Sequence, residues 1–254
     1  MRRKDIRTEI AWSSEDRITV RGLDLPNDII GNVNLGDMAF LELMGRLPDA
    51  RESVMFNAIA VTLVEHGIVP SVIAARMTYL GAPEALQAAV GAGLAGLGSV
   101  FVGSIEGTAR YVHEGLAARG DRSIDDIAQA IVADHRARKA IVPGIGHNLH
   151  KGEDPRVVRL FRVAAEQGFA VDEIALVNAV SEEAGRVTGR HLPVNATGAI
   201  GAIATSLGVP WKVARGIGVM ARAIGLVAHL LEESNDPMAF EIWQRTEHDA
   251  SPLE

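Results

Sequence analysis

The sequence predicts an all-α protein with one short β-hairpin at its N-terminus. Apolar residues recur three and four positions apart through most of the 254-residue chain, alanine is abundant, and aromatic residues make up only 4%. These features favour closely packed amphipathic helices. Hydrophobic residues account for 48% and charged residues for 22%, so the chain can bury a sizeable core as one large domain or as a core with a smaller lobe.

The best strand signals stand in the first 25 residues. Residues 9–12 and 17–21 contain β-branched and aromatic side chains, and the polar residues 13–16 lie between them. This pattern predicts a hairpin with a polar turn.

After Pro26 the pattern becomes helical, and glycine, proline and capping residues divide it into segments. Ser123, followed by Asp125 and Asp126, is typical of a capped helix start with acidic residues in the first turn. The pattern fades in a polar tail after Pro237. The predicted helices cover residues 38–44, 51–65, 70–80, 83–97, 104–119, a segment from 123 onward, and residues 154–167, 172–188, 196–207 and 211–233.

Composition disfavours several classes of protein. A net charge of −7 and a pI near 5.6 argue against nucleic acid as a partner. The absence of cysteine excludes disulfides, thiolate nucleophiles and zinc–thiolate sites. The basic residues 1–4 precede no apolar signal core, and apolar stretches such as 88–102 are broken by glycine or too short to span a bilayer. We therefore expect a soluble, cytoplasmic protein without a membrane partner.

Residues 143–156, Pro-Gly-Ile-Gly-His-Asn-Leu-His-Lys-Gly-Glu-Asp-Pro-Arg, carry the strongest functional signal. A histidine such as His147 can exchange a proton near neutral pH, and Arg156 offers a planar fork of donors for a carboxylate or phosphate. The flanking glycines allow backbone to approach a ligand closely. The combination indicates a site that holds an anion and moves a proton. His147 and His150 lack a third ligand at a familiar spacing, so no metal site is predicted.

Other segments allow a structural or a functional interpretation. His66 ends an apolar helix before a glycine, where capping of the last carbonyls is the simpler interpretation. Asn195 and Thr197 precede an apolar helix and either cap it or leave its N–H groups to an oxyanion. Arg222 stands in an apolar stretch and needs an internal acid partner or a bound anion. Residues 91–96 match G-x-G-x-x-G, but the preceding segment looks helical, so close helix packing is the better interpretation.

In this order, these segments resemble the citrate synthase superfamily, and in particular its short members, citryl-CoA lyase and the citryl-CoA lyase module of ATP-citrate lyase. The resemblance extends from about Ile18 to Glu233, and Pro-Gly-Ile-Gly-His followed by Asp-Pro-Arg is its most specific part. It implies a large helical domain of residues 1–103 and 204–254 and a smaller mobile lobe of residues 104–203, which closes over the substrate. It also implies a homodimer or a higher oligomer.

The resemblance implies a role for each candidate residue. His147 acts on the oxygen of the carbon that is attacked or released, and His66 faces the oxo-acid part of the substrate. Arg156 and Arg222 hold substrate carboxylates, and Asn195 belongs to the same substrate site. Coenzyme A is bound as a thioester substrate, and no metal takes part. The loop residues expected beside its thioester arm are Gly144, Ile145, Gly146 and Lys151.

Three positions depart from the family pattern. Phe101 stands where full citrate synthases have an enolate-stabilising histidine, and the lyase module likewise has phenylalanine there. Thr197 replaces the catalytic aspartate, and a hydroxyl cannot exchange a proton at neutral pH as a carboxylate does. Glu106, His191 or a bound water are the candidates to take over that role. Arg245 is the only candidate for the arginine that the family supplies across its dimer.

These expectations lead to one main hypothesis and two alternatives. The chain cleaves a 3-hydroxyacyl-CoA, either citryl-CoA or a related thioester, to acetyl-CoA and an oxo acid such as oxaloacetate, with Thr197 hydrogen-bonded to the enolate or to a water. Alternatively, it is a catalytically degenerate CoA-binding subunit that regulates or stabilises a partner enzyme. The third hypothesis is a lyase or synthase for a different acyl-CoA, in which solvent handles the proton.

Overall fold

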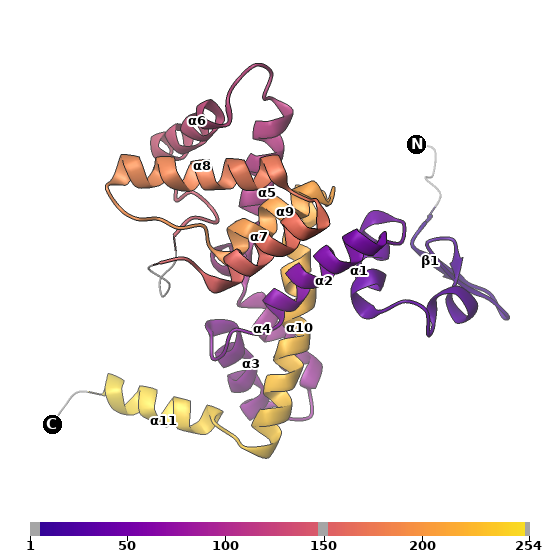
Figure 1. Cartoon of the computed structure of the whole chain (residues 1–254). Coiled ribbons are helices and arrows are strands. Elements are labelled where there is room, and N and C mark those ends of the chain that lie inside the picture. Colours follow the sequence, from indigo (N-terminus) through magenta and orange to yellow (C-terminus); the bar gives the residue numbers. More distant parts are fainter. Residues whose placement is uncertain (1–5, 147–151, 252–254) are drawn as a thin grey trace, which may run out of the picture.

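The structure is a computed structural model that describes residues 6–146 and 152–251. Helices form nearly all of the regular structure in these residues, and the one sheet among them is small and N-terminal (Figure 1). The prediction of an all-α fold with a short N-terminal β-element is therefore confirmed.

The N-terminal sheet is antiparallel and contains β1 (Ala11–Ser13), β2 (Ile18–Val20) and β3 (Leu23–Asp24) in that order. The first two strands are the predicted hairpin. The third strand is an addition to it, because the chain turns sharply at Arg21 and Gly22, which have φ of 49° and 83°. The sheet extends to one side of the helical body (Figure 1).

Eleven α-helices follow in the described residues, together with two short π-helical turns, η1 (Leu25–Ile29) and η2 (Gly98–Val102). The α-helices are α1 (Leu35–Met44), α2 (Ala50–Val64), α3 (Pro70–Gly81), α4 (Leu86–Ala95), α5 (Gly103–Ala117), α6 (Ile124–Ala137), α7 (Pro155–Gln167), α8 (Val171–Thr188), α9 (Ala196–Ser206), α10 (Trp211–Asn235) and α11 (Ala239–Ala250).

Side-chain caps fix several of the helix starts. Asp49 and Glu52 form a reciprocal capping box at α2, and Ser123 and Asp126 form another at α6, where the sequence predicts a capped start. These caps satisfy backbone N–H groups that have no partner within the helix.

Small residues set the closest contacts between helices. A Cβ on Gly201 of α9 would lie 2.6 Å from the Cβ of Thr108 on α5. A Cβ on Gly93 of α4 would lie 2.8 Å from both the Leu226 side chain on α10 and the Ser71 carbonyl on α3. The G-x-G-x-x-G segment therefore packs helices against one another, as the sequence predicts.

Helix α10 runs through the fold and packs against α2, α3, α4, α5 and α9 (Figure 1). With 25 residues, it is long and apolar enough to cross a membrane. The expectation that the apolar stretches are broken by glycine or too short to span a bilayer therefore does not hold for this segment, because the helix continues through its three glycines. Length and apolarity alone are a weak indication, since the core helix of a soluble protein passes the same test. In α10, 44% of the most apolar window is buried inside the fold.

The last helix, α11, corrects the expectation of an irregular polar tail after Pro237. Its first N–H groups are satisfied from outside the helix, because the carboxylate of Glu233 accepts hydrogen bonds from the backbone of Met238 (3.1 Å) and Ala239 (2.9 Å). A carboxylate at a helix N-terminus is stabilising. The capping carboxylate belongs to the preceding helix, so the sequence of the tail alone does not reveal where α11 begins.

Candidate functional site

The glycine-rich loop is fastened to the segment that leads into α9. Gly146 N–H donates to the Pro193 carbonyl (2.7 Å), and Asn195 N–H donates to the Gly144 carbonyl (3.0 Å). The Asn195 side-chain amide donates to the Gly146 carbonyl (2.7 Å). Ile145 is buried and pairs with Val194 in an isolated β-bridge. Residues predicted to belong to one site, about 50 positions apart in the sequence, are thus brought together. The described part of the loop ends at Gly146.

Gly144 allows this contact because it lies directly against the first turn of α9. Its φ is +77°, in the left-handed region that favours glycine. A Cβ at this position would lie 2.5 Å from the Cα of Gly198 and closer still to the Thr108 hydroxyl. His147 and Lys151, predicted to act on the substrate and to lie near coenzyme A, fall outside the described residues.

Thr197 belongs to a chain of hydrogen bonds at the start of α9. Its hydroxyl donates to Asn195 Oδ1 (2.6 Å), and the Ser104 hydroxyl lies 3.0 Å from Thr197 Oγ1. Asn195 Oδ1 also accepts from Gly198 N–H (3.1 Å). Asn195 is therefore the N-cap of α9, which is the structural interpretation left open by the sequence. The proton of Thr197 is directed at Asn195, so its oxygen can accept from Ser104 or from a ligand.

Two of the groups considered as replacements for the aspartate have other surroundings. The Glu106 carboxylate accepts a hydrogen bond from Arg215 Nε, in an ion pair that joins α5 to α10. His191 is exposed to solvent just before the segment that holds the loop. A Glu106 that acted on a substrate would first have to leave Arg215, and a surface histidine is in contact with bulk water. Neither is positioned as the aspartate would be at Thr197.

Arg156 lies in the first turn of α7 and is held by the residue that caps the helix. Asp154 is buried, and its carboxylate accepts from Arg156 Nε (3.0 Å), a terminal guanidinium nitrogen (2.7 Å) and the backbone N–H (3.0 Å). The Arg156 side chain is 28% exposed. One edge of the fork thus binds Asp154 in the bidentate manner typical of arginine and carboxylate, which fixes the direction in which the rest of the guanidinium faces.

Arg222 is a buried cation with a poor acid partner. Only 8% of the residue is exposed, and its Nη1 lies 3.6 Å from Glu65 Oε1, which is too long for a hydrogen bond. No described group accepts a hydrogen bond from this nitrogen. Burial lowers the pKa of Arg222 and outweighs the opposite effect of the Glu65 charge. The structure therefore supplies the acid partner that the sequence left open, but it leaves Nη1 without an acceptor.

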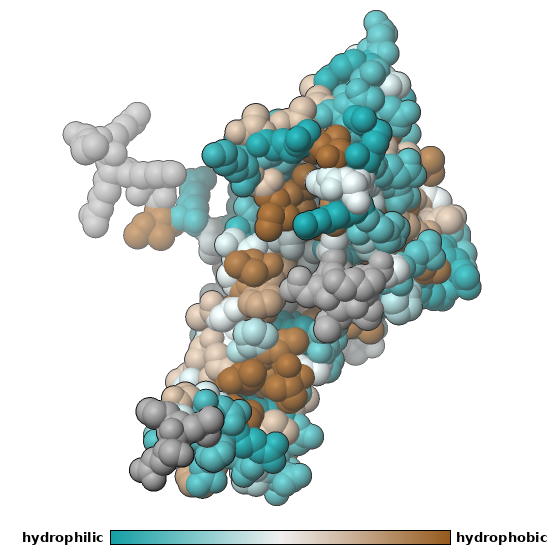
Figure 2. Space-filling view, turned by 90° about the vertical axis from the view of Figure 1, so that its left-hand side faces the viewer, coloured by the Kyte–Doolittle hydropathy of each residue, from teal (hydrophilic) through white to brown (hydrophobic). Residues whose placement is uncertain are grey.

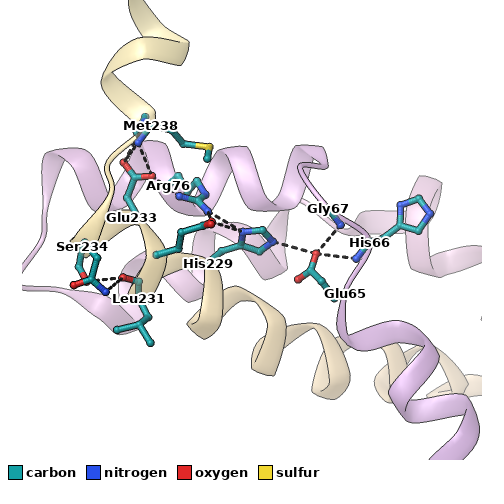
Figure 3. Close-up of polar contacts among 12 residues, drawn as sticks. Glu65, His66, Gly67, Arg76, His229, Leu231, Glu233, Ser234 and Met238 are labelled. Atoms are coloured by element: carbon teal, nitrogen blue, oxygen red, sulfur yellow. Dashed lines mark hydrogen bonds and ion pairs between the residues drawn. The ribbon is translucent and has the colours of Figure 1, made fainter.

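Glu65 organises the turn that carries His66. Helix α2 ends at Val64, and Glu65 Oε1 accepts from the backbone N–H of His66 (2.8 Å) and of Gly67 (2.7 Å). The His66 ring points away from the Glu65 carboxylate (Figure 3). A Cβ on Gly225 of α10 would lie 2.8 Å from Glu65 Oε2 and closer still to the backbone carbonyl oxygen of Val64. The backbone of α10 therefore lies directly against the end of α2. As a result, Arg222 and the turn that carries His66 both lie beside the Glu65 carboxylate.

Sequence reasoning missed Arg76, which is fully buried. It donates to Glu233 Oε2 (2.6 Å), lies 2.9 Å from His229 Nδ1 and forms an ion pair with Glu232 (Figure 3). The available signal was the same as for Arg222, a lone charge in an apolar helical stretch, Val-Ile-Ala-Ala-Arg-Met. Such a charge is rarely left unpaired in a folded protein.

The site residues form two polar clusters. The α9 cluster contains Gly144 to Gly146, Ser104, Asn195 and Thr197, and the α2 cluster contains Glu65, His66 and Arg222 with Arg76 and His229. Helix α7, which carries Arg156 in its first turn, packs against both α2 and α9. In residues 6–146 and 152–251, no three His, Asp or Glu side chains gather closely enough to hold a metal ion.

The sequence matches the model of a known family. The family model for the citrate synthase C-terminal domain matches residues 35–243, so the chain belongs to the citrate synthase family. The sequence-based resemblance is therefore confirmed.

Among solved structures, the chain is similar to citryl-CoA lyase from Hydrogenobacter thermophilus. The two are 34% identical with a TM-score of 0.83, and the match covers 99% of this chain and 92% of that one. The chain is also similar in fold to Methanosaeta concilii ATP citrate lyase in complex with (3S)-citryl-CoA, with 19% identity, a TM-score of 0.80 and coverage of 100% of this chain and 42% of that one.

Similarity to curated proteins is more distant. A citrate synthase-like protein of Phoma sp. is 26% identical over 213 residues, which is 81% of this chain and 44% of that protein. The chain spans about half the length of the curated relatives it matches, 55% for the first of them.

Proposed function

We propose that this protein is a citryl-CoA lyase-like enzyme that cleaves citryl-CoA or a related 3-hydroxyacyl-CoA to acetyl-CoA and an oxo acid. The observation that carries the proposal is the buried guanidinium of Arg222, whose Nη1 lacks an acceptor among the described residues. A buried donor of this kind is costly unless a ligand completes it. A substrate carboxylate would supply that acceptor, and family membership indicates which substrate class carries it.

The lyase direction is favoured over the synthase direction by two observations. The 34% identity extends over nearly all of the citryl-CoA lyase chain. Phe101, expected to stand where synthases use a histidine, is an apolar and partly exposed side chain that cannot stabilise an enolate by a hydrogen bond. Phe101 is close to the α9 cluster, because its carbonyl accepts from the Ser104 hydroxyl (3.2 Å).

The proposed reaction breaks one carbon–carbon bond. His147 takes the proton of the substrate hydroxyl, the hydroxyl carbon becomes a carbonyl, and the electron pair of the broken bond forms the thioester enolate. A proton on the enolate carbon then gives acetyl-CoA. Arg222 and the solvent-facing part of Arg156 hold the carboxylates of the oxo acid, and His66 faces its carbonyl end. Gly144 to Gly146 line the thioester arm.

Thr197 cannot deliver the final proton, because its own proton is directed at Asn195. We propose that a water supplies it, hydrogen-bonded beside the Thr197 and Ser104 oxygens, which lie 3.0 Å apart and contact each other directly. Loss of a well-placed general acid costs on the order of 10²- to 10⁴-fold in rate. The enzyme is therefore expected to be slow with citryl-CoA, or to act on a substrate whose enolate needs less help.

A homodimer is part of the proposal. Helices α10 and α11 expose apolar side chains that four- and three-residue spacing places along the helix surface. Those exposed by 40–64% are Val213, Met220, Ile224, Val227, Leu231, Phe240 and Trp243. Figure 2 shows apolar surface in the lower half of the molecule. A second copy would cover this face, and Arg245, now paired with Glu241, is the residue we expect to reach toward it. We also expect the protein to be cytoplasmic.

The test is a cleavage assay with purified protein and citryl-CoA. The wild type should release acetyl-CoA and oxaloacetate in equal amounts. His147→Ala should lower the rate by about 10²- to 10⁴-fold, whereas the matched control His248→Ala, an exposed histidine in the last turn of α11, should not. Equal rates for wild type and His147→Ala would refute the assignment.

The alternative of a degenerate CoA-binding subunit is favoured by one observation, the use of Thr197 and Asn195 as a helix cap. Thr197→Asp discriminates between the hypotheses. Cleavage that appears only in the variant would mean that the natural chain has left this reaction, either for a binding role or for a different acyl-CoA. Calorimetry with coenzyme A and a panel of acyl-CoA thioesters would then distinguish a CoA-binding subunit from an enzyme that acts on a different acyl-CoA.

A further inference from the structure

The Glu65 carboxylate holds more of the candidate site together than its place at the end of α2 suggests. A single oxygen, Oε1, accepts hydrogen bonds from the backbone of His66 and Gly67 at 2.8 and 2.7 Å. The same oxygen lies 3.0 Å from His229 Nε2 and 3.6 Å from Arg222 Nη1. Two residues predicted to bind the oxo acid, His66 in the turn after α2 and Arg222 in α10, therefore depend on the position of one atom.

A series of side-chain contacts leads from the core to the Glu65 carboxylate, from Arg76 through His229. Arg76 can only donate, so His229 Nδ1, which lies 2.9 Å away, must accept. This leaves the ring proton of His229 on Nε2, the nitrogen that faces Glu65. The Nε2–H bond is not aligned with Oε1, so this contact is close without being a good hydrogen bond. Glu233 binds the other terminal nitrogen of Arg76, and Glu232 binds the same nitrogen that faces His229.

We propose that Glu65 is a positioning residue of the oxo-acid site and that His229, oriented by Arg76, sets the direction of its carboxylate. The inference rests on the proposed function, in which His66 and Arg222 bind the oxo acid. Glu65 fixes the His66 turn through two charge-assisted hydrogen bonds and faces Arg222 from a distance that leaves Nη1 for a substrate carboxylate. It acts through these residues, and the substrate contacts them.

Two further observations support the proposal. Burial raises the pKa of Glu65, but contact with His229 and the N–H groups of His66 and Gly67 together bring the pKa below its ordinary value. The carboxylate is therefore ionised at neutral pH. The absence of a side chain at Gly225 lets α10 approach Glu65 Oε2, since a Cβ there would lie 2.8 Å from that oxygen.

The experiment measures two quantities separately, the amide protection of the His66 turn and the affinity for oxaloacetate. In Glu65→Ala, hydrogen exchange at the His66 and Gly67 amides should accelerate roughly 10- to 100-fold, the value of hydrogen bonds to a charged group. Oxaloacetate binding, followed by isothermal titration calorimetry without any thioester, should weaken by at least about 10-fold. Glu65→Gln retains an oxygen that can accept both N–H groups and should recover much of the protection. Glu114→Gln, an exposed carboxylate of α5, should match the wild type in both measurements.

A purely structural role for Glu65 would lower thermal stability but leave the oxaloacetate affinity of the folded protein unchanged, and that result would overturn the proposal. Unchanged exchange at His66 and Gly67 in Glu65→Ala would overturn it as well. His229→Asn, which keeps an acceptor near Arg76 but removes Nε2, should weaken oxaloacetate binding in the same direction. If the wild type neither cleaves citryl-CoA nor binds oxaloacetate, the proposed function fails, and amide exchange still decides whether Glu65 positions the turn.

Discussion

Gly144 is the position where the candidate coenzyme A loop touches α9, and Gly144→Ala tests that contact. Two costs add. Alanine at a φ of +77° is in the left-handed region, which costs about 1–2 kcal/mol. The new methyl group would lie 2.5 Å from the Gly198 Cα and closer to the buried Thr108 hydroxyl, and overpacking of this kind costs about 1–3 kcal/mol.

We therefore expect Gly144→Ala to lower the free energy of unfolding by about 2–5 kcal/mol. That is a large part of the roughly 5–15 kcal/mol that stabilises an ordinary domain. The neighbouring atoms are backbone and a buried side chain, so little relaxation is available. The shift would also disturb the hydrogen bond between the Gly144 carbonyl and Asn195 N–H, and with it the α9 cluster.

The assay is urea denaturation followed by circular dichroism, with Gly189→Ala as the matched control. Gly189 ends α8 with a φ of +65°, but a Cβ there meets nothing within 4 Å. The control should lose only the backbone cost of about 1–2 kcal/mol. If Gly144→Ala were no more destabilising than Gly189→Ala, the loop would not press against α9, and the geometry of the α9 cluster would be wrong.

Three further predictions concern other parts of the chain. Hydrogen bonds from Arg46 lower the pKa of Glu52 to about 2. The stability that the ionised Glu52 contributes to the folded state is therefore complete above its unfolded pKa of about 4.3, and it is lost as the pH falls through about 2. In Arg46→Ala, an NMR titration should find the Glu52 pKa well above 2, and an unchanged value would contradict the ion pair. Glu233→Ala removes the oxygen that accepts from Met238 and Ala239 N–H and should release the start of α11, which Trp243 fluorescence would detect. An unaltered spectrum would mean that Glu233 does not cap this helix. Leu231→Glu, on the exposed face of α10, should shift sedimentation from dimer to monomer, and an unaltered dimer would exclude this face as the interface.

The parts of the fold that could be predicted from the sequence are those with local causes. The capping box of Ser123 and Asp126 begins α6 as expected, and small residues in α4 meet neighbouring helices. Helix α11 was missed because Glu233, a residue of another helix, caps it. Long-range partners of this kind cannot be derived from periodicity.

The candidate site divides in the same way. Residue types and spacing predicted that Arg222 needs an acid or an anion, and the structure supplies Glu65 at a distance that satisfies only part of that need. The buried Arg76 gave an equal signal, but its meaning depends on Glu233 and His229, which lie more than 150 positions away in the sequence. A charged residue in an apolar helix predicts a buried polar cluster. The residues that form the cluster can be identified only from the fold.

The hydrogen bonds of Thr197 bear on its expected replacement of the family's catalytic aspartate. The Thr197 hydroxyl donates to Asn195 Oδ1, the same oxygen that caps α9 through Gly198 N–H. An aspartate at 197 could not donate, and its carboxylate would face that oxygen, so two acceptors would meet across a short distance. The Asn195 amide could not simply rotate, because its nitrogen is bound to the Gly146 carbonyl. The threonine is therefore integrated with the cap and with the glycine-rich loop, and a return to aspartate would require Asn195, Ser104 or the loop to adjust. This coupling favours a reaction in which water delivers the proton.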